Sequence, residues 1–367
     1  MSFAILGMGA AVPANRVTQE EAADAARIVC CRTPEQAALL PLLYRLTGIE
    51  TRHMVLPQEV VHDVLGGTQQ TQSVFLPGDK ANHGPTTGQR LQIYAREAGP
   101  LAAQAASQAL DNSGLRPREL THLLTVSCTG FAAPGVDIEL IKQLSLRPTV
   151  QRTHIGFMGC HGAFNALRVA GAFTGADPQA RVLVCAVELC SLHYHYSWDP
   201  EKMVANALFG DGAAAVVGIA DPGAPADCWR VGSTGCCLFP DSQEDMSWLI
   251  GDYGFEMTLS SRVPELLGRH LRPWLEGWLA ENGVPLAAVA SWAIHPGGPR
   301  ILTAIEKALD LPRAATAVSR EVLAEYGNLS SPTVFFLIDR LRTPAAPRPC
   351  VALGFGPGLV AEAMLLT

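Results

Sequence analysis

The 367-residue sequence lacks several features, and each absence excludes a class of protein. No apolar run reaches the length of about 18 residues that a helix needs to cross a bilayer, so no membrane span is expected. Acidic residues outnumber basic ones, 34 against 27, which argues against a nucleic-acid binder held by a basic surface. The 10 cysteines include no C-x-x-C pair, so neither a disulfide scaffold nor a zinc ribbon is predicted.

The N-terminus has no basic segment ahead of its apolar run, so it does not resemble a signal peptide. Together with the scattered cysteines, this favours a reducing cytoplasm as the location. Hydrophobic residues make up 48% of the chain and charged residues 17%, which is enough apolar material for a large core. At roughly 150 residues per domain, the length predicts two domains or one duplicated unit.

Apolar runs alternate with helix-like segments along the chain, which predicts an α/β fold in layers. Strands are expected at 3–8, 120–128, 182–188, 213–219, 229–233, 255–259, 289–294 and 351–355. The segment 220–227, rich in Ala, Pro and Asp, is the clearest break. We therefore predict a duplicated layered unit with one half at 1–220 and the other at 221–367.

Residues 152–171 form the stretch most suggestive of chemistry, a turn with one cysteine followed by a helix. Gly159 and Gly162 flank Cys160 and permit a tight backbone. A cysteine at a helix N-terminus is shifted toward thiolate, because unpaired N–H groups and the helix dipole favour negative charge. A thiolate in a dry pocket is a nucleophile for acyl groups, although a lone cysteine is also often a buried structural residue.

Two other segments carry polar residues in rigid surroundings. His295 ends an apolar strand and precedes a Gly/Pro turn, where it could act as a base or serve as a core histidine. Asn328 lies on a loop after Gly327, where its NH₂ group could stabilise an oxyanion or cap a turn. Cysteine, histidine and asparagine together supply the nucleophile, base and oxyanion donor that thioester acyl transfer requires.

Five motifs in fixed order resemble those of type III polyketide synthases, the chalcone synthase-like branch of the thiolase superfamily. They are Gly159-Cys160 with its following helix, 207–215, 294–299, 327–330 and 354–358. The resemblance covers nearly the whole chain. It implies two αβαβα halves of a thiolase-like protomer, which is normally a homodimer. It also implies no metal and no redox cofactor.

By the same resemblance, Cys160 carries the growing acyl chain and pairs with His295 as thiolate and imidazolium. His295 and Asn328 hold the thioester carbonyl of malonyl-CoA while it loses CO₂. The enolate then attacks the acyl thioester, and free CoA is a product. After repeated condensation the chain would cyclise to a pyrone, resorcinol or chalcone-type ring. The alternative is a single-condensation ketosynthase of the kind that initiates fatty-acid synthesis, which shares all three residues.

Other positions are assigned by the resemblance to the substrate site. Phe209 matches a gatekeeping phenylalanine, and Met257 falls where plant enzymes have a second gatekeeping aromatic. The cavity is further expected to include Cys128, Thr129, Ala133, Cys190, His193, Ser330, and the loop Gly354, Phe355, Gly356, Pro357 and Gly358. Ala133 stands where a methionine often crosses the dimer interface.

Three departures from the plant pattern leave alternatives open. The stretch 39–46 is nearly uncharged where plant enzymes bind CoA phosphates, so other basic residues, an acyl carrier protein or a lipid chain could take that place. His161 replaces an apolar residue and either perturbs the pKa of Cys160 or points outward. His193 and His195 alternate along the chain and would share one face of a strand, as two metal ligands can, but no third ligand has clear spacing.

Two more distant functions remain less favoured. A non-decarboxylating thiolase uses a second cysteine in the terminal glycine loop, where this chain has none at 354–358. A non-enzymatic acyl-binding protein would have no need of all three polar residues, Cys160, His295 and Asn328.

Overall fold

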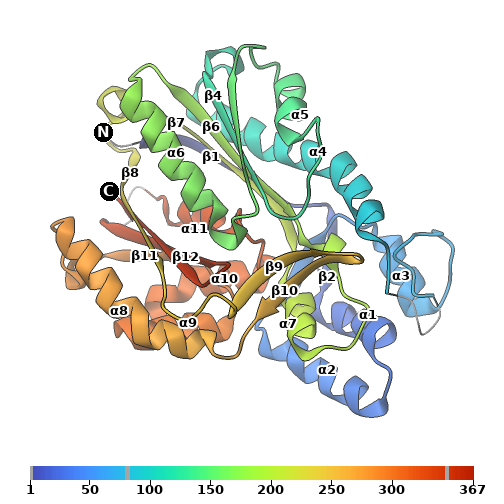
Figure 1. The fold of residues 1–367 in the computed structure, drawn as a ribbon. Coiled ribbons are helices and arrows are strands. Elements are labelled where there is room, and N and C mark those ends of the chain that lie inside the picture. Colours follow the sequence, from blue (N-terminus) through green and yellow to red (C-terminus); the bar gives the residue numbers. More distant parts are fainter. Residues whose placement is uncertain (1–2, 79–82, 344–346) are drawn as a thin grey trace.

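The computed structural model describes residues 3–78, 83–343 and 347–367. Its centre is a mixed sheet of nine strands in the order β11-β12-β13-β8-β1-β7-β6-β4-β5 (Figure 1). The strands are β1 (Phe3–Ala11), β4 (His122–Ser127), β5 (Gln151–Gly156), β6 (Arg181–Leu189), β7 (Asp211–Ala220), β8 (Trp229–Leu238), β11 (Ser291–Ile294), β12 (Cys350–Gly356) and β13 (Val360–Leu366). The predicted α/β class is confirmed.

The sheet repeats one pairing pattern. In the first part, β4 is parallel to β6, and β6, β7 and β1 follow as antiparallel neighbours. In the second, β11 is parallel to β12, and β12, β13 and β8 follow in the same way. This repetition is what a duplicated unit requires. The boundary at residue 220 stays a prediction, because β1 pairs with β8 and makes the sheet continuous.

Helices cover both faces of the sheet. The inner layer holds α6 (Gly162–Ala176) and α11 (Thr333–Leu341). The outer layers hold α4 (Thr87–Ser113) and α5 (Val136–Gln143) on one side, and α8 (Val263–Glu281) and α9 (Pro299–Leu309) on the other. Figure 1 shows α6 and α11 between the two parts of the sheet. The order of layers is therefore αβαβα, as the resemblance implied.

Side-chain alternation along the strands explains these layers, because successive residues of a strand point to opposite faces. On β6, Val182 and Val184 pack in the core around α6 and α11, whereas Leu183 and Cys185 pack against α4. Strands β12 and β13 alternate in the same way between the inner helices and the α8–α9 layer. Each strand of this kind is buried on both faces, which is why its sequence is a continuous apolar run.

A smaller group of elements lies beside the sheet and packs on its own core. It consists of β2 (Asn15–Thr18), α1 (Gln19–Cys30), α2 (Pro34–Leu46), β3 (Thr51–Met54), α3 (Gln58–Gly66) and α7 (Pro200–Leu208). Thr18 and Glu21 form a capping box at the start of α1, since the side chain of each accepts a hydrogen bond from the other's backbone N–H. Two further parts of the described chain position the site. They are a hairpin of β9 (Met246–Gly251) and β10 (Gly254–Leu259), and the helix α10 (Ala317–Tyr326).

Two helices form against the local sequence pattern. Gly, Gln, Pro and Thr are frequent in the segment 57–87, which favours loop, but α3 forms within it because Val60, Val61 and Val64 bury one face. Gly99 and Pro100 favour a break, but α4 runs through them unbroken. A proline inside a helix costs about 3 kcal/mol. The extensive buried face that α4 packs against the sheet outweighs that cost.

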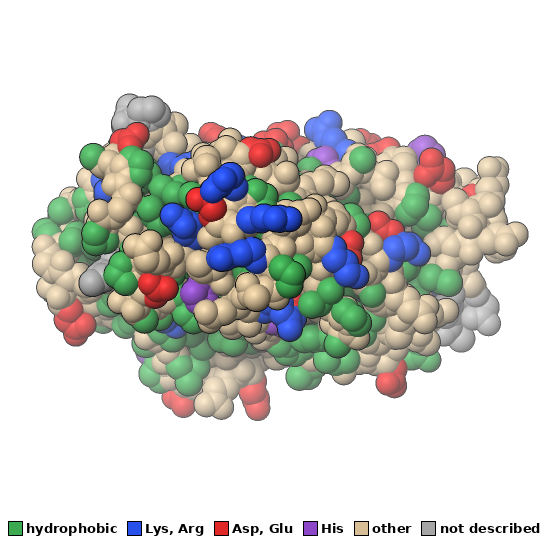
Figure 2. Space-filling model, turned by 90° about the horizontal axis from the view of Figure 1, so that it is seen from above, with side chains coloured by type: hydrophobic (Ala, Val, Ile, Leu, Met, Phe, Trp, Pro, Cys, Tyr) green, Lys and Arg blue, Asp and Glu red, His purple; other side chains and the backbone are tan. Residues whose placement is uncertain are grey.

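Charged side chains are unevenly distributed over the surface. Figure 2 shows Lys and Arg side chains gathered toward the middle of one face, although the chain is acidic overall. In the described part of the chain, no helix is long and apolar enough to cross a bilayer.

Candidate active site

The three candidate catalytic side chains line one buried cavity. Cys160 lies in a short 3-10 turn, Gly159–His161, immediately before α6. His295 directly follows β11, and Asn328 lies between α10 and α11. The remaining lining is mostly apolar and includes Phe209, Met257 and Phe355. Residues from three distant segments therefore meet in a largely dry space, which is where polar groups act most strongly on a reacting carbonyl.

Backbone hydrogen bonds hold two of these residues in place. The His295 N–H donates to Leu353 O at 2.8 Å, which extends the pairing of β11 with β12. The Asn328 N–H donates to Leu208 O at 2.8 Å, and the Gly210 N–H donates to Asn328 O at 3.0 Å. Phe209 and Asn328 thus form a small β-bridge, which positions the two residues together.

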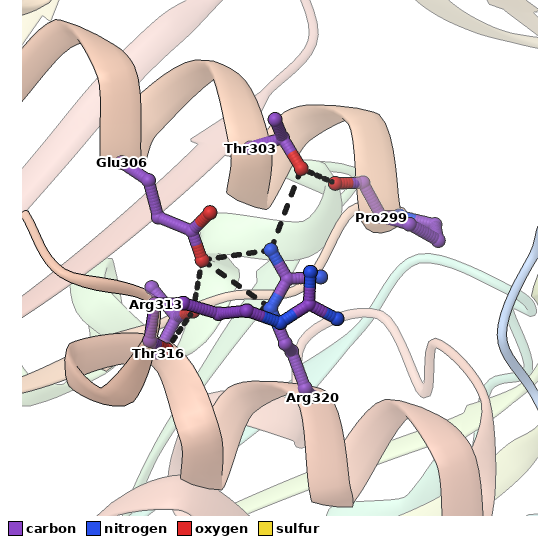
Figure 3. A network of polar contacts seen from close by, with 6 residues as sticks. All are labelled: Pro299, Thr303, Glu306, Arg313, Thr316 and Arg320. Atoms are coloured by element: carbon purple, nitrogen blue, oxygen red, sulfur yellow. Dashed lines mark hydrogen bonds and ion pairs between the residues drawn. The ribbon is translucent and has the colours of Figure 1, made fainter.

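A polar network connects the segments that carry His295 and Asn328 (Figure 3). Glu306 on α9 accepts a hydrogen bond from Arg320 Nη2 on α10 at 2.7 Å, and Thr316 Oγ1 also donates to Glu306. Helix α9 begins shortly after His295, and α10 ends just before Gly327 and Asn328. The network therefore ties α9 to α10, the two helices that adjoin the loops carrying His295 and Asn328.

The environment of Cys160 differs from the sequence expectation. Burial raises the pKa of the thiol to about 11, and hydrogen bonds with Ser330 and Asn328 oppose that change. The expected shift toward thiolate is thus reversed, because the loss of solvation outweighs the partial charge of the helix terminus. The cysteine itself lies in the turn before α6, with a side chain only 8% exposed.

His295 is buried in a similarly apolar environment. Burial lowers its pKa to about 3, and the charge of nearby His161 adds to the effect. Neither ring nitrogen has a hydrogen-bond partner within the described residues. Burial therefore favours the neutral thiol and the neutral imidazole over the ion pair that the resemblance implies.

Asn328 presents a defined end of its amide to the cavity. Its Oδ1 accepts a hydrogen bond from the Ser330 N–H at 2.8 Å. The side chain also hydrogen-bonds Cys160, and with Oδ1 already engaged the NH₂ group must face the sulfur. An NH₂ group aimed at the nucleophile is the geometry that an oxyanion donor needs.

The predicted substrate residues divide among adjoining spaces. Phe209 and Met257 line both the cavity above and a second one that also reaches Cys160. The second cavity includes the predicted residues Cys128, Thr129, Cys190, Ser330 and Pro357. Phe209 and Met257 thus stand where the two spaces adjoin, and their gatekeeping role stays a prediction. Ala133 lines neither space and lies in an outer groove beside β5, so a substrate contact from it would require a second copy of the chain.

The terminal glycine loop lies against the nucleophile turn. A Cβ on Gly159 would come within 2.3 Å of Pro357, and one on Gly354 within 2.5 Å of Phe164. Gly356 has equally little room, with His161 at 2.3 Å, while Gly358 adopts a φ of 79° that favours glycine. These positions need glycine because β12 and its loop approach the inner helix so closely.

His193 separates the second cavity from a larger apolar one, which it lines. Its Nε2–H donates to Thr129 O at 2.7 Å, and its Nδ1 accepts from the Phe255 N–H at 3.0 Å. The ring also stacks on Phe255 with centroids 4.1 Å apart. Both ring nitrogens of His193 are therefore bonded to backbone groups, so neither has a lone pair free to bind a metal ion together with His195.

Sequence reasoning missed Glu188, a carboxylate buried at the end of β6. It accepts hydrogen bonds from Ser331 Oγ at 2.5 Å, Thr129 Oγ1 at 2.7 Å and the Cys128 N–H at 2.9 Å. It thereby ties the cavity wall to the start of α11. The sequence offered one signal for it, a single acidic residue at the end of an otherwise apolar strand. Burying a charged side chain there costs free energy unless it is hydrogen-bonded, so such a residue indicates polar partners.

Glu188 should make stability depend on pH. Burial raises its pKa from 4.5 to about 7, so ionisation is easier in the unfolded chain than in the folded one. The unfolding free energy should therefore fall as pH rises between these values, by roughly 3 kcal/mol from this group. Urea unfolding of the wild type and Glu188→Gln should show the variant gaining relative stability across that interval. Parallel pH profiles would contradict the assignment.

The chain matches family models over nearly its whole length. A model described as chalcone and stilbene synthases, N-terminal domain, matches residues 2–222, and the C-terminal domain model matches residues 231–367. A 1,3,6,8-tetrahydroxynaphthalene synthase of Streptomyces peucetius subsp. caesius is 34% identical, covering 97% of this chain and 90% of its own. An alpha-pyrone synthesis polyketide synthase-like Pks18 of Mycobacterium tuberculosis is 30% identical, covering 98% and 90%.

Solved structures agree with this assignment. The crystal structure of PKS-I from the brown alga Ectocarpus siliculosus superposes with a TM-score of 0.90 at 31% identity, covering 100% of this chain and 98% of that one. The type III domain of Steely1, a type I/III hybrid from Dictyostelium, gives a TM-score of 0.89 at 26% identity. The thiolase-type layers described above are thus shared with type III enzymes. The chain belongs to the chalcone and stilbene synthase family and is an acyl-transferring enzyme of the type III polyketide synthase class.

Proposed function

We propose that this enzyme condenses an acyl starter with several malonyl-CoA units on Cys160 and releases a cyclised polyketide. The observation that carries the proposal is the meeting of Cys160, His295 and Asn328 in one buried cavity between Phe209 and Met257. A nucleophile, a base and an amide donor at one apolar site are the groups that decarboxylative condensation needs.

The first half of the reaction loads the starter. The Cys160 thiol attacks the starter thioester while His295 takes its proton. The tetrahedral intermediate then expels the CoA sulfur, and His295 returns the proton to it, so CoA leaves as the free thiol. Because burial favours the neutral form of both groups, we expect the proton transfer to accompany the attack. The neutral imidazole that this requires is the form that burial favours.

The second half extends the chain. The thioester carbonyl of malonyl-CoA accepts hydrogen bonds from the Asn328 NH₂ and a His295 N–H. The bond to the carboxylate breaks, CO₂ leaves, and its electron pair forms the enolate that these donors stabilise. The enolate carbon attacks the acyl thioester on Cys160, and the sulfur departs as the new carbon–carbon bond forms. The extended chain can then return to Cys160 for another round.

The starter is proposed to be a long aliphatic acyl group. The larger cavity begins at Cys190, Phe209 and Met257 and passes between α1 and α3. Its lining there is aliphatic and consists of Ala22, Ala25, Val29, Val60, Val61 and Val64. An apolar channel that starts at the gatekeeping residues suits an alkyl chain, whose transfer from water is favourable by about 0.8 kcal/mol per buried CH₂.

The proposal also covers the substrates, the oligomeric state and the cellular location of the enzyme. We propose CoA thioesters as both substrates, with an acyl carrier protein as the alternative donor, no metal or redox cofactor, and a homodimer in the cytoplasm. The exposed edge strand β5 supports the homodimer, because an unpaired strand edge is a ready pairing surface. The neighbouring Phe131 is 41% exposed, which suits a buried contact in a dimer.

The number of condensations distinguishes this function from its alternative. The enzyme should be incubated with carbon-13-labelled malonyl-CoA and acyl-CoA starters of graded chain length, and the products weighed by mass spectrometry. Several labelled two-carbon units per product, formed fastest from long starters, are expected. A single added unit would instead indicate an initiating ketosynthase. Faster turnover of short starters would contradict the proposed starter class.

A further inference from the structure

A buried arginine, Arg52 on β3, supports the backbone next to Asn328. Its side chain is only 3% exposed and borders the larger apolar cavity. Its Nη1 donates hydrogen bonds to Asn206 O at 2.6 Å and to Phe209 O at 2.9 Å. Burying a guanidinium costs free energy unless its N–H groups are bonded, so these two bonds stabilise the charge in its buried position.

The segment that Arg52 bonds is the one that pairs with Asn328. Leu208 O accepts a hydrogen bond from the Asn328 N–H at 2.8 Å, and the Gly210 N–H donates to Asn328 O at 3.0 Å. Between these two residues, Phe209 O is the acceptor for Arg52. One side chain therefore anchors the middle of the three residues that hold the backbone of Asn328.

The aliphatic stem of Arg52 also packs on the loop that carries Asn328. Gly327 adopts a φ of 72°, which favours glycine, and a Cβ there would come within 3.0 Å of Arg52 Cγ and 2.8 Å of Leu208 O. A Cβ on Gly210 would lie 3.6 Å from Arg52 Cβ. Arg52 thus contacts both segments that meet at the β-bridge, so a change in its side chain should move one relative to the other.

Such a movement matters because the Asn328 side chain acts over a short distance. Its Oδ1 is engaged by the Ser330 N–H, and its NH₂ group faces Cys160. An oxyanion donor is effective when it lies about 2.7–3.1 Å from the place of the developing charge. A misplacement of about 1 Å, caused by a change away from the reacting atoms, can cost about 10²-fold in rate.

We propose that Arg52 is a positioning residue for the decarboxylation of malonyl-CoA. By bonding Phe209 O and packing on Gly327, it fixes the β-bridge and with it the place of the Asn328 NH₂ group. Arg52 lines neither of the two cavities that reach Cys160, so it acts through Asn328 rather than on the substrate. The inference rests on the proposed role of Asn328 in stabilising the enolate.

Two replacements of Arg52 separate its hydrogen bonds from its bulk. Arg52→Lys keeps the positive charge and N–H donors, whereas Arg52→Met keeps an unbranched stem and has no donor. Decarboxylation should fall about 10-fold to 10²-fold in the methionine variant and clearly less in the lysine variant. Acyl loading of Cys160 does not use the Asn328 NH₂ group, so it should stay within a few-fold of the wild type in both. Packing on Gly327 alone predicts equal rates for the two variants.

A double-mutant cycle tests whether Arg52 acts through Asn328. Once Asn328→Ala has removed the amide, Arg52 has no donor left to position. Adding Arg52→Met to Asn328→Ala should therefore lower decarboxylation hardly further, although the same change costs the wild type at least about 10-fold. Two independent contributions would instead multiply. CO₂ release from carboxyl-labelled malonyl-CoA measures all four enzymes.

Arg90→Met is the matched control for a weakened fold. Arg90 on α4 is also buried and donates to backbone carbonyls, to Pro85 O at 2.8 Å and to Tyr194 O at 3.0 Å, but these lie outside the β-bridge. Its loss should change decarboxylation and loading by the same factor. A selective loss of decarboxylation in this control would show that general destabilisation produces the effect.

A further variant covers the case in which Arg52→Met fails to fold. The shorter side chain of Arg52→Gln withdraws the donor from Phe209 O but leaves a polar group, so decarboxylation should again fall more than loading. Decarboxylation at the wild-type rate in the folded variants, equal rates for lysine and methionine, or multiplied effects in the cycle would overturn the inference. Wild-type decarboxylation in Asn328→Ala alone would overturn the proposed role of Asn328, and the inference with it.

Discussion

Replacing Cys160 with alanine should abolish polyketide formation while leaving the release of CO₂ from malonyl-CoA measurable. Without the sulfur, no starter can be held as a thioester, so the enolate has nothing to attack. His295 and Asn328 still line the cavity in this variant and can still stabilise the enolate oxygen. Products should be followed by mass spectrometry and CO₂ by release of label from carboxyl-labelled malonyl-CoA.

Cys185→Ala is the matched control for this change. Cys185 is fully buried on β6, in the core that faces α4, and the pKa of its thiol is raised by burial to about 12. It shares burial and residue type with Cys160 but not its cavity, so its loss should leave turnover near the wild-type rate. Polyketide formation in Cys160→Ala would show that another group carries the acyl chain.

Replacing Asn328 with alanine should lower malonyl-CoA decarboxylation by about 10²- to 10³-fold, the usual effect of removing one oxyanion donor. The loading of Cys160 depends on the sulfur and His295, so it should fall far less. The two steps are measured separately, as CO₂ release and as the acyl adduct on the protein.

Asn328→Asp separates the lost donor from a disturbed loop. An aspartate can still accept the hydrogen bond from the Ser330 N–H that Asn328 accepts at 2.8 Å. It places an acceptor where the NH₂ group was, so decarboxylation should fall at least as far as in the alanine variant. Decarboxylation near the wild-type rate in either variant would show that Asn328 does not stabilise the enolate.

The arrangement of the site follows from the repeat in the fold. Strands β4 and β11 occupy equivalent places in the two parts of the sheet, and Cys128 follows one as His295 follows the other. The inner helices α6 and α11 are also equivalent, and Cys160 and Asn328 lie just before their respective starts. The reactive groups thus come from matching strand and helix ends, which the duplication brings face to face.

Much of the fold and of the site could be predicted from the sequence. Strands buried on both faces appear as continuous apolar runs, and the motifs around Cys160, His295 and Asn328 occur in the same order as in type III polyketide synthases, which indicates one shared site. The terminal glycines were likewise identified, and the structure gives their reason in the close approach of Pro357 and Phe164.

What sequence could not predict depends on neighbours from distant segments. The pKa of Cys160 rises because the cavity wall is assembled from many elements, and no local pattern reports that burial. Glu188 gave only a weak local signal because its partners lie on three other segments. The direction of His161 was open for the same reason, since its ring contacts Asn165, which is held in turn by Glu362 on the last strand.

The most direct test of the account is the location of the acyl group. The enzyme should be incubated with a long-chain acyl-CoA in the absence of malonyl-CoA, digested and examined by peptide mass spectrometry. One acyl adduct on Cys160, missing from Cys160→Ala and unchanged in Cys185→Ala, is the predicted result. An adduct on another of the 10 cysteines, or none on a folded enzyme, would contradict it.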